Sequence, residues 1–74
     1  MSKLPVLKYR ELVIILQKNG FIFKRQAKGS HEIWFHPTSM RFVTIPRHEG
    51  KTLKKGTLSA IIRDSGLGKK SFQK

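Results

Sequence analysis

Three things are scarce in this 74-residue sequence: it has no cysteine, only four acidic residues, and no long run of apolar residues. The absence of cysteine excludes disulfides, thiolate metal sites and thiol nucleophiles, and is typical of a reducing compartment. The longest apolar run, residues 12–16, is far shorter than the roughly 20 residues that span a bilayer, and the first residues lack the apolar stretch of a signal peptide. We therefore expect a soluble, cytoplasmic protein.

The chain length limits the size of the fold. A chain this short buries only about 60% of the surface that its unfolded form exposes, so a deep substrate cavity is not expected. We predict a single domain over residues 1–74, with a core at about 3–67 and a basic, flexible tail at 68–74.

Positive charge is abundant. Sixteen Lys and Arg residues face four acidic ones, which gives a net charge of +12. Such a charge attracts polyanions, and nucleic acid is the leading partner. The alternatives are a ribosomal-type structural protein, an anionic membrane surface or an acidic protein partner.

Apolar spacing predicts two helices. Tyr9, Leu12, Val13 and Leu16 recur at helical intervals and predict a helix over residues 8–19, although Lys8 stands where a capping Ser, Thr or Asp is usual. Gly20 is suited to a left-handed helix end, with the next residue folded back on the last turn. Residues 57–65 predict a second helix, and Gly66 followed by an apolar residue repeats this ending.

Three segments between the helices have strand composition. They are residues 21–26, 31–36 and 41–45, and short turns between them predict an antiparallel meander. Alternation predicts that Ile33 and Phe35 share the core face with Val43 and Ile45. On that basis, Trp34 and Phe42 lie on the opposite face and are partly exposed. The fold class is therefore α+β, in the order α-β-β-β-α, with two helices on one face of a three-stranded sheet and the other face open.

His31 is the histidine whose surroundings suggest chemistry, because it follows directly after Lys28, Gly29 and Ser30. The glycine allows close approach of a phosphate, the lysine offers charge to the transition state, and the serine can bond a phosphate oxygen. The imidazole is then suited to activating an RNA 2′-hydroxyl. From spacing alone, the commoner interpretation of this segment is a hairpin turn followed by a solvated histidine without a catalytic role.

The other histidines and the basic residues give weaker signals. We interpret His36 as a structural residue at the end of a strand. His48 is either structural or functional. No Cys or carboxylate pair completes a tetrahedral set with the histidines, so we predict no metal site. A distributed phosphate-binding surface is expected, and its candidate RNA-binding residues are Arg25, Lys28, Gly29, Ser30, Arg47, His48, Lys54 and Lys55. Lys54 and Lys55 precede the second helix, whose dipole favours anions.

Six short segments together resemble one known family. They are Leu4-Pro5, Gly20-Phe21, Gly29-Ser30-His31, His36-Pro37, Ile45-Pro46-x-His48, and Lys55-Gly56-Thr57-Leu58-x-x-Ile61. In this order and spacing they resemble the HicA mRNA interferase toxins, also called the YcfA family, from about Lys3 to Leu67. The departures from the family pattern are Lys8 at the cap position and an inserted-looking Gln26-Ala27-Lys28 before the glycine.

The resemblance implies both a fold and a function. The fold is similar to the double-stranded RNA-binding domain. The function is that of a toxin-antitoxin endoribonuclease that cuts mRNA without a metal or another cofactor, with His31 as the catalytic residue and a HicB-type antitoxin covering the active site. The rival hypothesis is a non-catalytic RNA-binding module of the same fold, and a third class is a DNA-binding or ribosome-associated structural protein.

Overall fold

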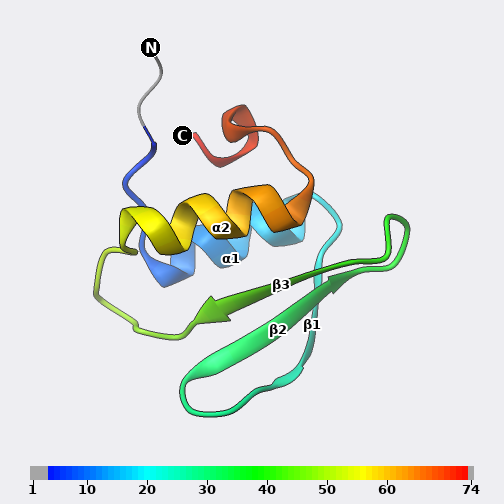
Figure 1. Ribbon diagram of the computed structural model, residues 1–74, viewed down its shortest axis with the longest axis horizontal. Helices are drawn as coiled ribbons and strands as arrows, with labels where there is room; N and C mark the ends of the chain where they lie inside the picture. The colour runs from blue at the N-terminus through cyan, green and yellow to red at the C-terminus, as the bar shows by residue number, and fades with distance from the viewer. Residues whose placement is uncertain (1–3, 74) are drawn as a thin grey trace.

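The computed structural model describes residues 4–73, which form two helices, three strands and a short 3-10 helix (Figure 1). In chain order these are α1 (Tyr9–Lys18), β1 (Ile22–Gln26), β2 (His31–His36), β3 (Arg41–Pro46), α2 (Lys55–Ser65) and η1 (Lys69–Phe72). The predicted α+β order is confirmed. The expected first residue of the core, Lys3, and the last residue of the expected tail, Lys74, lie outside the described residues.

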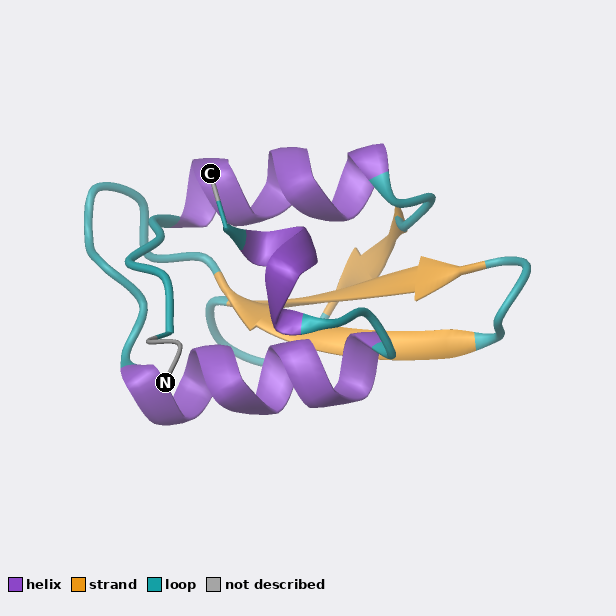
Figure 2. Cartoon of the chain, turned by 90° about the horizontal axis from the view of Figure 1, so that it is seen from above, coloured by secondary structure: helices purple, strands orange, loops and turns teal. Residues whose placement is uncertain are grey.

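The sheet is an antiparallel meander in the order β1-β2-β3. Both helices cover one of its faces and leave the other open (Figure 1). Seen from above, the helices run side by side over the sheet, with η1 between them (Figure 2). This arrangement is the predicted double-stranded RNA-binding-domain-like fold. Within residues 4–73, no helix has the length and apolar character needed to cross a membrane.

The first helix ends as its sequence predicts. Gly20 has φ +93°, and the N–H of Phe21 donates to the carbonyl of Leu16 at 2.9 Å, which is the Schellman arrangement. The fold-back buries the Phe21 side chain in the core. At the other end, Lys8 has no acceptor to offer, but its N–H donates to Glu11 Oε1 at 3.0 Å, which provides half of a capping box. Local sequence therefore sets both ends of α1.

The prediction of which β2 residues face the core is wrong. Trp34 pairs with Val43, so both lie on the face that the helices cover, and Trp34 is only 4% exposed. Ile33 and Phe35 lie on the open face instead, and Phe35 pairs there with Phe42. Val43 and Ile45 are buried and Phe42 is half exposed, as predicted. Alternation separates the two faces of a strand, but it does not tell which of them the helices cover.

Part of the expected flexible tail is ordered. Residues 69–72 form η1, which packs against α1, and the side chain of Phe72 is fully buried in the main core. Because apolar burial stabilises in proportion to area, a Phe at this position anchors the chain end. The tail prediction is therefore corrected over these residues.

Candidate active site

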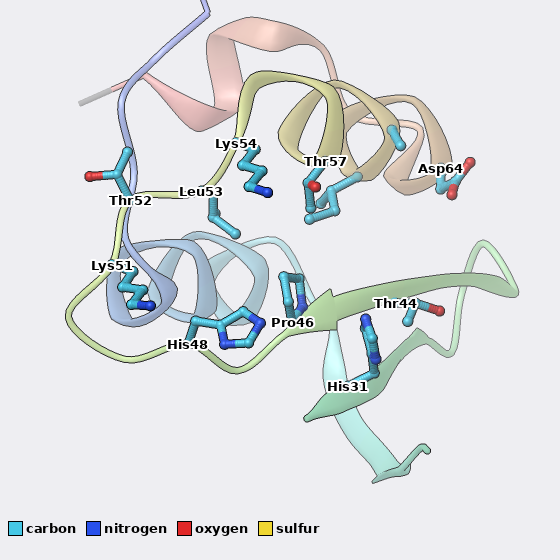
Figure 3. Close-up of a pocket in the computed structure, with 12 residues that line it drawn as sticks. His31, Thr44, Pro46, His48, Lys51, Thr52, Leu53, Lys54, Thr57 and Asp64 are labelled. Atoms are coloured by element: carbon cyan, nitrogen blue, oxygen red, sulfur yellow. The ribbon is translucent and has the colours of Figure 1, made fainter. Parts of the chain in front are cut away.

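A cleft of about 590 Å³ opens between one side of α2, the loop after β3 and the neighbouring ends of β2 and β3 (Figure 3). Both imidazoles with a predicted or possible function, those of His31 and His48, line it. The lining is completed by Thr44, Pro46, Lys51, Thr52, Leu53, Lys54, Thr57, Ala60, Ile61 and Asp64. The cleft thus draws on segments that are distant in the sequence.

Backbone hydrogen bonds hold the walls of the cleft in place. The N–H of Arg47 donates to the carbonyl of Ser30 at 2.7 Å, which joins the loop after β3 to the turn before His31. At the other end of this loop, the N–H of Leu53 donates to the carbonyl of Leu7 at 2.8 Å. The loop between these two bonds is therefore tethered at both ends, and it carries His48 and Lys51 into the cleft.

The hydrogen bonding of the His31 ring defines its chemistry. Its Nδ1 lies 3.1 Å from the carbonyl oxygen of Lys28, and a carbonyl can only accept, so Nδ1 carries the proton. The neutral ring then has an unprotonated Nε2, and the side chain is exposed. Gly29 has φ +68°, the left-handed conformation that makes this tight turn possible. The turn Lys28-Gly29-Ser30 therefore fixes the orientation of the imidazole and leaves Nε2 as its free acceptor.

The charge of the cleft is predominantly positive. Lys51 and Lys54 line it, and Lys54 is also the N-cap residue of α2, where no side chain caps the helix. The positive end of the helix dipole adds to these ammonium groups. Asp64 is the acidic residue of the lining, and it pairs with Arg63 at 3.2 Å. An anion such as a phosphodiester therefore finds two cations and a helix start in one place.

The structure separates the predicted RNA-binding residues into groups. His48 and Lys54 line the cleft with His31, and the turn residues Lys28, Gly29 and Ser30 are exposed beside it. Arg25 and Lys55 are exposed but do not line it. Among the other lining residues, Thr44, Ala60 and Asp64 were not singled out from the sequence. These residues come from β3 and from two turns of α2, so only the fold brings them together and no sequence motif marks them.

The side chain of Arg47, a predicted RNA-binding residue, is half exposed and paired within the protein. Its guanidinium bonds Glu49 at 3.1 Å and lies 3.8 Å from Glu32. The hydrogen bond to Glu49 is the main cause that raises the pKa of Arg47 above its ordinary value. These contacts hold Arg47 to the loop after β3, and its RNA-binding role stays a prediction.

A buried carboxylate, which sequence reasoning missed, lies next to His31 in the chain. Glu32 is 3% exposed, and its Oε1 accepts from the Tyr9 hydroxyl at 2.8 Å and from the Trp34 indole N–H at 3.1 Å. Burial, followed by the hydrogen bond to this carboxylate, raises the pKa of Tyr9 to about 12. These contacts join the start of α1 to β2 on the covered face. Glu32 and Trp34 are two residues apart on β2 and therefore share a face of the sheet. The sequence could not predict the burial of Glu32, because it did not show which face the helices cover.

His36 is structural, as its sequence position suggested. Its Nδ1 accepts from the N–H of Ser39 at 3.1 Å, and its ring meets Phe21 edge-on at 5.0 Å between centroids. Among residues 4–73, no group of three or more His, Cys, Asp or Glu side chains is placed to hold a metal ion.

Comparison with known proteins adds the family. No curated protein matches the chain closely. The family model described as the HicA toxin of bacterial toxin-antitoxin systems matches residues 9–67, which includes every strand, both helices and the whole lining of the cleft. The match covers most of the chain, and we conclude that this protein belongs to the HicA toxin family.

Proposed function

We propose that this toxin is an endoribonuclease that cleaves mRNA in the cleft, with His31 as the catalytic residue and without a metal ion or cofactor. The observation that carries the proposal is the state of the His31 ring, whose Nδ1 is held by the Lys28 carbonyl while the ring lines a basic cleft. An mRNA substrate places this activity in the cytoplasm.

The proposed reaction is a transphosphorylation. Nε2 of His31 takes the proton of a 2′-hydroxyl, and the 2′-oxygen forms a bond to the adjacent phosphorus. The bond from phosphorus to the 5′-oxygen of the next nucleotide breaks, which leaves a 2′,3′-cyclic phosphate and a 5′-hydroxyl. His48, in the same cleft, protonates the leaving oxygen, and Lys51 and Lys54 stabilise the charge that develops on the phosphate.

Neutralisation by a HicB-type antitoxin is part of this proposal. Membership of a toxin-antitoxin family implies an antitoxin in general. A net charge of +12 favours a partner that covers the cleft with an acidic surface, because complementary charge accelerates association and selects the partner.

The test of His31 uses a defined transcript in the presence of EDTA. We expect His31→Ala to lower the cleavage rate by about 10²-fold or more while RNA binding stays nearly unchanged. Ser59→Ala, an exposed change on α2 outside the cleft, is the control and should cleave like the wild type. Equal cleavage by wild type and His31→Ala would refute the role of His31. A wild type that binds RNA but never cuts it supports the non-catalytic module, and a preference for duplex DNA without RNA loss supports the third class.

The proposed role of His48 as the general acid is tested with a substrate whose leaving group needs no proton. A uridine 3′-phosphodiester of p-nitrophenol needs no acid, because nitrophenolate leaves without a proton. We expect His48→Ala to slow RNA cleavage by about 10²-fold but to cleave the activated diester nearly as fast as the wild type. His31→Ala should be slow on both substrates. If His48→Ala slows both equally, His48 is not the acid.

A further inference from the structure

One face of the sheet is turned away from the helices (Figure 1). An apolar row crosses this open face. It consists of Ile22, Phe35 and Phe42, which lie side by side because Phe35 pairs with Ile22 on β1 and with Phe42 on β3. Ile22 is 51% and Phe42 52% exposed. Adjacent exposed apolar side chains of this kind mark binding surfaces more often than isolated ones do.

The geometry of the row suits a flat, anionic ligand. The rings of Phe35 and Phe42 lie 4.6 Å apart between centroids, so Phe42 is supported from the neighbouring strand. The ammonium group of Lys24 lies 5.6 Å from the centre of the Phe35 ring. Phe35 is partly buried, whereas Phe42 is half exposed, so the row offers one exposed ring with a cation near its supporting neighbour. Aromatic rings next to cations are the combination with which proteins bind a nucleobase and its phosphate.

The apolar row is continuous with the candidate active site. The next register along the sheet joins Arg25, Ile33 and Thr44, and beyond it His31 pairs with Pro46. Paired residues share a face, so His31 lies on the same side of the sheet as Phe35, about 13 Å away along β2 at 3.3 Å per residue. Thr44 and Pro46 also line the cleft, so the row leads into it.

We propose that the apolar row is a stacking platform for unpaired bases of single-stranded RNA, a few nucleotides from the phosphate at His31. Phe42 provides the stacking surface, and Lys24 and Arg25 contact the neighbouring phosphates. The proposal rests on the proposed function in one respect: the cleavage site at His31 fixes where along the strand these bases lie.

Charge favours a polyanion such as RNA over a second copy of the chain as the occupant. The four acidic residues of the chain all lie elsewhere: Glu11 on α1, Glu32 on the covered face of β2, Glu49 in the loop after β3, and Asp64 on α2. Within residues 4–73, the open face therefore combines the rings of Phe35 and Phe42 with cations and carries no acidic side chain. A second copy of the chain would bring another charge of +12 to this face, which opposes self-association.

The experiment measures binding of an unstructured RNA oligonucleotide by fluorescence anisotropy in the His31→Ala background, where the RNA is not cut. Phe42→Leu keeps an apolar side chain but removes the ring, and we expect it to raise Kd about 5- to 50-fold. Phe23→Leu is the matched control and should change Kd by less than about two-fold, because Phe23 is a half-exposed ring that packs on Trp34. The slope of log Kd against log salt should not change, since no phosphate contact is removed.

An abasic oligonucleotide of the same length provides the decisive comparison. It has the phosphates but no bases, so Phe42→Leu and its parent should bind it equally. Equal weakening of abasic and normal RNA would overturn the proposal, as would unchanged RNA binding together with lost antitoxin binding or lost self-association. Thermal unfolding of each variant verifies that it is folded. A wild type that fails to cleave RNA refutes the proposed function. The binding measurements do not depend on cleavage, so they still test whether the apolar row stacks RNA bases.

Discussion

Replacing Glu32 by alanine removes the acceptor of two hydrogen bonds that join α1 to the sheet. Trp34 is almost fully buried, so its indole N–H, 3.1 Å from Glu32 Oε1, has no water to turn to and is left unpaired. An unpaired buried donor costs about 1–3 kcal/mol, and a hydrogen bond to a charged acceptor contributes about 1.5–3 kcal/mol. Tyr9 is only partly buried, so its hydroxyl recovers part of its loss from water.

These contributions are offset in part because the variant no longer buries a carboxylate. We expect Glu32→Ala to lower the free energy of unfolding by about 2–4 kcal/mol, a large share of the stability of a small domain. Glu32→Gln keeps an acceptor for the indole and should lower it by about 1–2 kcal/mol. The assay is urea unfolding followed by the fluorescence of Trp34, the single tryptophan of the chain.

The control for this prediction is Glu49→Ala. Glu49 also pairs with Arg47, but its side chain is 53% exposed, and an exposed ion pair contributes at most about 1 kcal/mol. A double-mutant cycle of Tyr9→Phe with Glu32→Gln should give a coupling energy of about 0.5–3 kcal/mol. Loss of less than about 0.5 kcal/mol in Glu32→Ala would show that the buried carboxylate does not hold α1 to the sheet.

Three further predictions concern other parts of the fold. Folding raises the pKa of Tyr9 from 10.0 to about 12, so its hydroxyl adds stability that is present below pH 10.0 and is lost between pH 10.0 and about pH 12. Over this interval the free energy of unfolding should fall more in the wild type than in Tyr9→Phe. Parallel curves of the two proteins would contradict the assignment. Phe72→Ala should lower the free energy of unfolding by about 3–5 kcal/mol, because its ring is fully buried; an unchanged melting temperature would contradict the packing of η1. Gly20→Ala should cost about 1–3 kcal/mol in urea unfolding, since φ is +93° and a Cβ would lie 2.7 Å from a histidine ring; a neutral result would mean that the helix end adapts freely.

Much of the fold follows from local sequence. The strand composition of residues 31–36 and the turns on either side predicted β2 to the residue, and glycines 20 and 66 predicted where the helices end. These features depend on backbone conformation and on neighbours within a few residues, which the sequence lists directly. The turn before His31 singled it out as a candidate, but from spacing alone a solvated turn histidine was the commoner interpretation, and only the family resemblance favoured a catalytic role.

Other features depended on contacts between distant segments. The assignment of Trp34 to the open face was wrong because alternation is symmetric, and the choice between faces depends on where both helices pack. Phe72 was assigned to a flexible tail because no local pattern announces a 3-10 helix of four residues that docks on α1.

The sequence by itself determined the charge, the order of the elements, the helix ends and the imidazole that follows Gly29 and Ser30, because each of these is a property of composition or of near neighbours. Only the tertiary structure decided that Glu32 is buried beside Tyr9 and Trp34, that His48 shares a cleft with His31, and that Phe35 and Phe42 lie side by side on the open face. The physical reason is that burial and proximity between separate elements are set by packing, in which every helix and strand contributes to the outcome.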